Sequence, residues 1–165
     1  MSRDQSRYLF TGAGVERLRR RIEDARRAYQ TVCDSNPEAR EAGDSSVWHD
    51  NFAFEENQRQ MHQRARRIRD LENVLARVEV VLPPRAPSRV TLGTRVSYLL
   101  GGDVETRSCV IAGWDDGDPA ARRVSYNSPL GAALSGAVAD EEREVVLAGR
   151  ARSVLVVAVE PAEDT

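Results

Sequence analysis

Two segments of the chain carry apolar residues at the spacing of paired helices. In the first, the apolar positions alternate at intervals of three and four and are Val15, Leu18, Ile22, Ala25, Tyr29 and Val32. In the second, apolar residues recur every seven positions, at Phe54, Met61, Ile68, Leu75 and Leu82. Two such seams joined by one short connection predict an antiparallel coiled-coil hairpin over residues 1–82.

The connection between the two seams is acidic and contains a glycine. Pro37 predicts a break in the first helix near residues 34–36, because the residue before a proline is disfavoured in a helix. A short helical piece is then expected up to Ala42, and Gly43 permits a sharp turn. Asn57 and Arg64 interrupt the second seam close to this connection. We therefore expect an acidic tip near residues 41–51, where the hairpin is least stable.

Composition changes after a stiff proline-rich linker at residues 83–89. Short runs of β-branched residues separated by turn residues predict strands at 90–100, 106–112, 122–126, 142–147 and 153–159. Ser128, Pro129 and Gly136 have the positions of an N-cap, a first helical residue and a C-terminal glycine, which predict a short helix. The expected fold class is α+β, with a helical hairpin followed by a small β-sheet domain over residues 90–165.

Charge and cysteine content narrow the class of protein. The formal net charge is −2, so no overall basic field draws the chain onto nucleic acid. All 24 basic residues are arginine, which is typical of a GC-rich genome, and we discount arginine clusters as phosphate sites. Cys33 and Cys109 match no metal or redox spacing and are expected as free thiols. With no apolar run near the roughly 18 residues of a membrane span and no signal peptide, we expect a cytoplasmic protein. We also expect a monomer.

Three blocks of the sequence have the character of family motifs. The first is Thr11, Gly14, Leu18 and Ile22, the second is the stretch Glu38–Asp44, and the third is the stretch from Ser125 to Gly136. They resemble three blocks of the bacterial GreA/GreB family of transcription elongation factors. In the same order, these are the opening T-x-x-G-x-x-x-L-x-x-x-L, the E-A-R-E-x-G-D of the coiled-coil tip and the S-P-[IL]-[AG]-x-A-L-x-G block of the C-terminal domain.

The resemblance implies an FKBP-like C-terminal domain that docks on RNA polymerase beside the secondary channel. It also implies that the coiled coil enters the channel and that tip carboxylates help to hold the second catalytic Mg²⁺ of the polymerase. Such a factor is not an enzyme and has no cofactor of its own, because it stimulates the polymerase's own cleavage of backtracked RNA. Nucleic acid is then contacted only indirectly, within the elongation complex.

The tip departs from the family at its second acidic position. Asp44 matches the first carboxylate, but Val47 stands where the family has an acid before Asn. The next acid–Asn pair is Asp50-Asn51, so the simplest alignment inserts three residues and makes Asp50 the second carboxylate. Asp44 and Asp50 are thus the candidate metal-assisting pair. An alternative is a solvated acidic loop that caps two helices.

Further residues are candidates for contact with the polymerase. At the tip they are Glu41, Trp48 and His49, and in the third block they are Ser128 and Pro129. Glu41 also fits a helix-terminus charge, and the third block also fits a purely structural helix.

Three functions stay open from the sequence. The first is a Gre-type factor that promotes transcript cleavage, and the second is a Gre-like regulator that binds the polymerase and inhibits or modulates it without cleavage. The third is a coiled-coil adaptor with no role in transcription.

Overall fold

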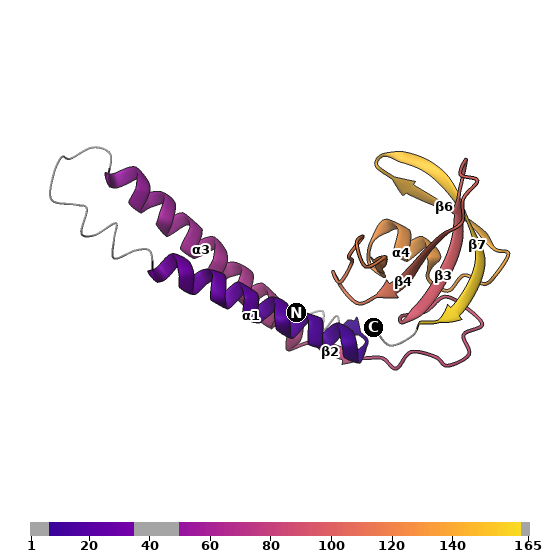
Figure 1. The fold of residues 1–165 in the computed structure, drawn as a ribbon, viewed down its shortest axis with the longest axis horizontal. Coiled ribbons are helices and arrows are strands. Elements are labelled where there is room, and N and C mark those ends of the chain that lie inside the picture. Colours follow the sequence, from indigo (N-terminus) through magenta and orange to yellow (C-terminus); the bar gives the residue numbers. More distant parts are fainter. Residues whose placement is uncertain (1–6, 35–49, 163–165) are drawn as a thin grey trace, which may run out of the picture. The chain divides into compact units, whose positions relative to one another are not determined.

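The structure is a computed structural model that describes residues 7–34 and 50–162. It confirms the α+β class, with two long helices followed by strands and one short helix (Figure 1). The helices are α1 (Gly12–Asp34), α3 (Asp50–Leu75) and α4 (Pro129–Leu134). The strands are β1 (Tyr8–Phe10), β2 (Val78–Val80), β3 (Thr94–Leu100), β4 (Arg107–Ala112), β5 (Arg123–Ser125), β6 (Glu142–Leu147) and β7 (Arg150–Pro161).

The chain divides into two compact units. One is Leu18–Ala76, which we call the arm, and the other is Met1–Arg17 together with Arg77–Thr165, which we call the sheet unit. The beginning of α1 thus groups with the C-terminal half of the sequence. No helix within the described ranges is long and apolar enough to cross a membrane.

The arm is a hairpin in which α1 and α3 run side by side (Figure 1). Its seam is best buried at Leu18, Ile22 and Leu71, which have 2%, 4% and 6% of their surface exposed. Farther along the hairpin, Tyr29 and Met61 are only half-buried. The apolar contact between the helices therefore weakens toward the tip.

Polar groups on the described part of α3 agree with this weakening. Asn57 has a buried Oδ1 with no hydrogen-bond partner among the described residues. Nearer the other end of the arm, Arg26 and Glu72 form an ion pair between the helices, with Nη2 and Oε1 2.6 Å apart. This pair is exposed, so it adds only about 0.2–1 kcal/mol.

The second helix is shorter than the seam predicted. It ends at Leu75, whereas the seven-residue repeat suggested continuation to Leu82. Residues 78–80 form β2 instead, which pairs in parallel with β1. Valines on both sides of Glu79 favour a strand, and Leu82 is 86% exposed, so it belongs to no helical seam.

The five-stranded sheet of the sheet unit has the order β5-β4-β3-β7-β6. Strand β3 is antiparallel to both β4 and β7, β6 and β7 form an antiparallel pair, and β5 is parallel to β4. Residues of β3 alternate between buried and half-buried positions over its whole length. One face of the sheet is therefore the core face, as the alternation predicted.

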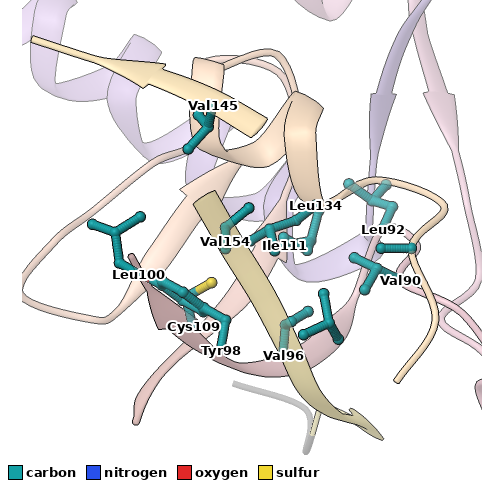
Figure 2. Packing of buried hydrophobic residues seen from close by; sticks show 12 residues of the cluster. Val90, Leu92, Val96, Tyr98, Leu100, Cys109, Ile111, Leu134, Val145 and Val154 are labelled. Atoms are coloured by element: carbon teal, nitrogen blue, oxygen red, sulfur yellow. The ribbon is translucent and has the colours of Figure 1, made fainter. Parts of the chain in front are cut away.

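The core packs α4 against that face. Leu134 of α4 is fully buried and belongs to the same cluster as Ile111 and Val154, which lie beside it in Figure 2. Val90, before the first strand of this sheet, joins the cluster, because its backbone is held by hydrogen bonds with Gly136 and Ala137. A five-stranded sheet with one short covering helix is the arrangement expected for an FKBP-like domain.

Candidate functional site

Most of the predicted tip site lies outside the described residues. Glu41, Asp44, Trp48 and His49 belong to residues 35–49, and Asp50 is described only as the first residue of α3. The pairing of Asp44 with Asp50 and their metal-assisting role therefore stay predictions.

The two predicted contact residues of the C-terminal half begin α4. Ser128 is the N-cap, since its Oγ accepts a hydrogen bond from the Gly131 N–H at 3.1 Å. The same hydroxyl donates to the Ser125 carbonyl at 2.7 Å. Pro129 occupies the first helical turn and is exposed. The Ser128 hydroxyl is thus used within the fold, whereas the Pro129 ring is presented to solvent.

Gly131 is required by the close approach of α4 to the end of β5. A Cβ at this position would overlap the Ser125 carbonyl oxygen and lie 2.9 Å from the Tyr126 Cα. Such distances are well inside ordinary carbon contacts of about 3.5–4.0 Å. The order Ser-Pro-x-Gly at residues 128–131 therefore has three structural reasons. Ser128 caps the helix, Pro129 has the backbone angle of a first helical turn, and Gly131 allows the close backbone contact.

Asn127 ties the loop before α4 to the turn that follows β4. Its Oδ1 accepts a hydrogen bond from the Asp115 N–H at 3.1 Å and also contacts the Ser125 hydroxyl. The Ser125 hydroxyl in turn donates to the Gly113 carbonyl at 2.6 Å. The turn at residues 113–116 and the loop at residues 125–129 thus share a hydrogen-bond network.

The other side of this turn contacts the N-terminal segment. We call this contact the junction; it joins β1 and the first turns of α1, as far as Arg17, to residues 113–116. Backbone contact is direct, because the Trp114 N–H donates to the Leu9 carbonyl at 3.2 Å. The Trp114 ring lies 4.9 Å from that of Tyr8, between centroids. A Cβ at Gly113 would lie 2.6 Å from Phe10 Cδ1, so the approach requires glycine.

An ion pair between Arg17 and Asp116 forms the most buried polar contact of the junction. Arg17 Nε lies 3.1 Å from Asp116 Oδ1, and Arg17 Nη2 lies 2.7 Å from Oδ2. The side chains are 21% and 5% exposed. The forked geometry gives a charge-assisted, bidentate contact. Because a Cβ at Gly14 would lie 3.3 Å from Asp116 Oδ2, the carboxylate also sits at the positive end of α1.

Sequence reasoning did not find the junction. The strands predicted from the sequence begin at residue 90, so neither β1 nor its contact with Trp114 was predicted. Arg17 and Asp116 are 99 positions apart, and neither stands in a recognisable motif. A pairing over that distance leaves no periodic signal in a single sequence.

The pKa shifts in the described residues have structural causes. Burial raises the pKa of the Cys109 thiol to about 11, and burial likewise raises the pKa of Tyr98. The hydrogen bond from Arg143 lowers the pKa of Glu141, with help from the Val138 N–H. A hydrogen bond with Cys33 raises the pKa of Tyr29. Burial and local hydrogen bonds thus account for these pKa shifts.

A long helical hairpin joined through one of its helices to a small mixed sheet unit defines the class of the protein. Its N-terminal part, residues 8–80, matches the family model for the transcription elongation factor N-terminal domain of GreA/GreB. Residues 85–161 match the model for the C-terminal domain of GreA/GreB. The chain belongs to the GreA/GreB family of transcription elongation factors.

Individual relatives agree with the family models. The chain is 32% identical to transcription elongation factor GreA of Sphingopyxis alaskensis over 148 residues, which cover 89% of this chain and 91% of that one. It is 34% identical to GreA of Nautilia profundicola over 143 residues, covering 85% and 86%. Among solved structures, it is similar to GreA factor homolog 1 of Thermus thermophilus with a TM-score of 0.44 and 22% identity, covering 94% and 99%.

Proposed function

We propose that this chain binds RNA polymerase at its secondary channel and promotes cleavage of backtracked transcripts. The observation that carries the proposal is the match of both family models, in order, to a chain with a helical hairpin and a small α+β unit. In this proposal the protein is a cytoplasmic monomer and not itself an enzyme, because the reaction takes place at the polymerase's active site.

The loop that begins α4 is the proposed contact of the sheet unit with the polymerase. Asn127 and Pro129 are both exposed, and they flank a serine whose hydroxyl is occupied by the helix cap. The loop is held from behind by the Ser125 and Gly113 contacts. A rigid loop that presents a proline ring loses little conformational freedom when a partner binds it.

The tip is the proposed contact with the polymerase's metal site. Asp44 and Asp50 are the residues of this chain that would supply carboxylate oxygens, which are the ligands Mg²⁺ prefers. A second metal ion in such a site activates water and neutralises developing charge on the phosphodiester. A long hairpin suits this task, because α1 alone has 23 residues and spans on the order of 35 Å.

Transcript cleavage in a stalled, backtracked complex of the cognate polymerase tests this proposal. Wild-type protein should shorten the RNA from its 3′ end, and Asp44→Ala should lower the rate by about 10²-fold or more, as expected for loss of a group that stabilises the transition state. Asp24→Ala is the matched control, since Asp24 is an exposed acid of α1 whose described ion partner is the neighbouring Arg27. Equal activity of the Asp44 variant and wild type would contradict the metal-assisting role.

The altered spacing of the tip favours one second candidate, a regulator that occupies the channel without stimulating cleavage. It follows from Val47 standing where the family has its second acid. The same assay separates the two functions. Slower elongation, with binding but without cleavage by the wild type, would establish the regulator and overturn the first proposal.

A further inference from the structure

We propose that Asp116 is a positioning residue, whose ion pair with Arg17 links the base of α1 to the loop that begins α4. Binding of the polymerase at that loop would then be coupled to the first turns of α1, as far as Arg17. This inference rests on the proposed function for its biological meaning. Its physical part, the fixing of α1 by Asp116, stands on the contacts of the sheet unit alone.

The first link runs from the loop to the turn that carries Asp116. Asn127, which is exposed and lies two residues before Pro129, accepts a hydrogen bond from the Asp115 N–H. Ser125, two residues earlier, donates to the Gly113 carbonyl. The turn is closed by the Asp116 N–H, which donates to the same Gly113 carbonyl at 3.3 Å. A displacement of the loop therefore displaces the backbone of residues 113–115, which leads directly into Asp116.

The second link runs from Asp116 to α1. Arg17 lies in the second turn of that helix and makes a bidentate contact with the Asp116 carboxylate. The carboxylate faces the α1 N-terminus at Gly14, where Thr11 Oγ1 accepts a hydrogen bond from the Gly14 N–H at 3.1 Å. The Asp116 carboxylate thus contacts the Arg17 side chain and lies beside the first turn of α1, where the helix dipole is positive.

The carboxylate of the Arg17–Asp116 pair is more buried than those of the other described ion pairs of the sheet unit. Asp116 is 5% exposed at its side chain, whereas Asp118, two residues on, is 41% exposed. Asp118 receives its hydrogen bonds from residues 120, 121 and 123, all in its own turn. Asp118→Asn is therefore a matched control that removes a carboxylate from the adjacent turn without touching α1.

Hydrogen exchange in the free protein tests the physical part. Exchange of the amides at residues 12–17 should accelerate by about fivefold in Asp116→Asn and by about tenfold or more in Arg17→Met. It should change by less than about threefold in Asp118→Asn. Circular dichroism confirms that each variant is folded. Unchanged exchange in both junction variants would overturn the inference, whatever the polymerase assays show.

Polymerase assays test the functional part. The Kd for core polymerase should stay within about threefold of wild type in Asp116→Asn, while the cleavage rate at saturating protein falls by about tenfold. A purely structural role would lower affinity and rate together, and that result would overturn the inference. If wild-type protein neither binds nor stimulates the polymerase, it is the proposed function that fails, and the exchange result still decides whether Asp116 fixes α1.

Discussion

Arg17→Met is expected to destabilise the protein more than Asp116→Asn does. The first change leaves a carboxylate that is 5% exposed without its cation. Breaking a buried pair in this way costs about 3–5 kcal/mol, and the positive end of α1 offsets up to about 1 kcal/mol of it. The second change leaves a guanidinium that is 21% exposed beside an amide that still accepts a hydrogen bond. Its cost is about 1 kcal/mol.

Urea unfolding, monitored by the fluorescence of Trp114 at the junction, measures the stability that each substitution removes. The Trp48→Phe background leaves Trp114 as the only indole of the chain. With an m-value of about 2 kcal/mol/M, a net loss of about 2–5 kcal/mol lowers the midpoint by about 1–2.5 M for Arg17→Met. The midpoint for Asp116→Asn should fall by about 0.5 M.

An exposed pair of the same unit provides the control for this comparison. Arg7 and Glu79 are 3.2 Å apart with side chains 71% and 46% exposed. Arg7→Met should therefore change stability by less than about 0.5 kcal/mol. Equal losses of unfolding free energy in Arg17→Met and Arg7→Met would refute the claim that the Arg17–Asp116 pair is buried. A larger loss in Asp116→Asn than in Arg17→Met would refute the claim that the unpaired carboxylate is the costlier of the two.

Three other outcomes are expected from the sheet unit and the arm. Gly131→Ala should lower the free energy of unfolding by more than about 2 kcal/mol, because its Cβ would overlap a backbone carbonyl; thermal unfolding measures this. At pH 8 a maleimide should label Cys33 and spare Cys109, whose pKa is about 11 and which is 3% exposed; labelling of both thiols in folded protein would contradict the burial. The hydrogen bond from Arg143 lowers the pKa of Glu141, so its contribution is complete above the unfolded pKa of about 4.3 and is lost as pH falls through the folded value. Wild type should therefore lose its stability advantage over Glu141→Gln as pH drops from about 5 to 3, as urea midpoints at each pH would show.

The parts of the fold that depend on local pattern were predictable from the sequence. The start of α1 at Gly12 follows from the capping hydroxyl of Thr11, and α4 follows from Ser128, Pro129 and the glycine after its end. Strand β6 has the predicted bounds, 142–147, because valines and charged residues set its limits. In each case the signal lies within a few residues of the element it specifies.

The parts that depend on distant partners were not predictable. Strand β1 has three residues and forms because β2 and Trp114 supply hydrogen-bond partners from far along the chain. The same pairing ends α3 at Leu75, where the seven-residue repeat alone would have continued the helix. The ion pair of Arg17 with Asp116 follows from the packing of β1 and has no local signal. The tip residues remain predictions from the resemblance.

The rate of RNA cleavage in a backtracked elongation complex, with and without wild-type protein, tests the central claim most directly. The account predicts that added protein shortens the transcript from its 3′ end, in a reaction that requires Mg²⁺ and saturates with protein concentration. RNA of unchanged length at saturating protein, with the complex demonstrably bound, would contradict it. That result would show that a GreA/GreB-family chain with this tip binds the polymerase for a purpose other than cleavage.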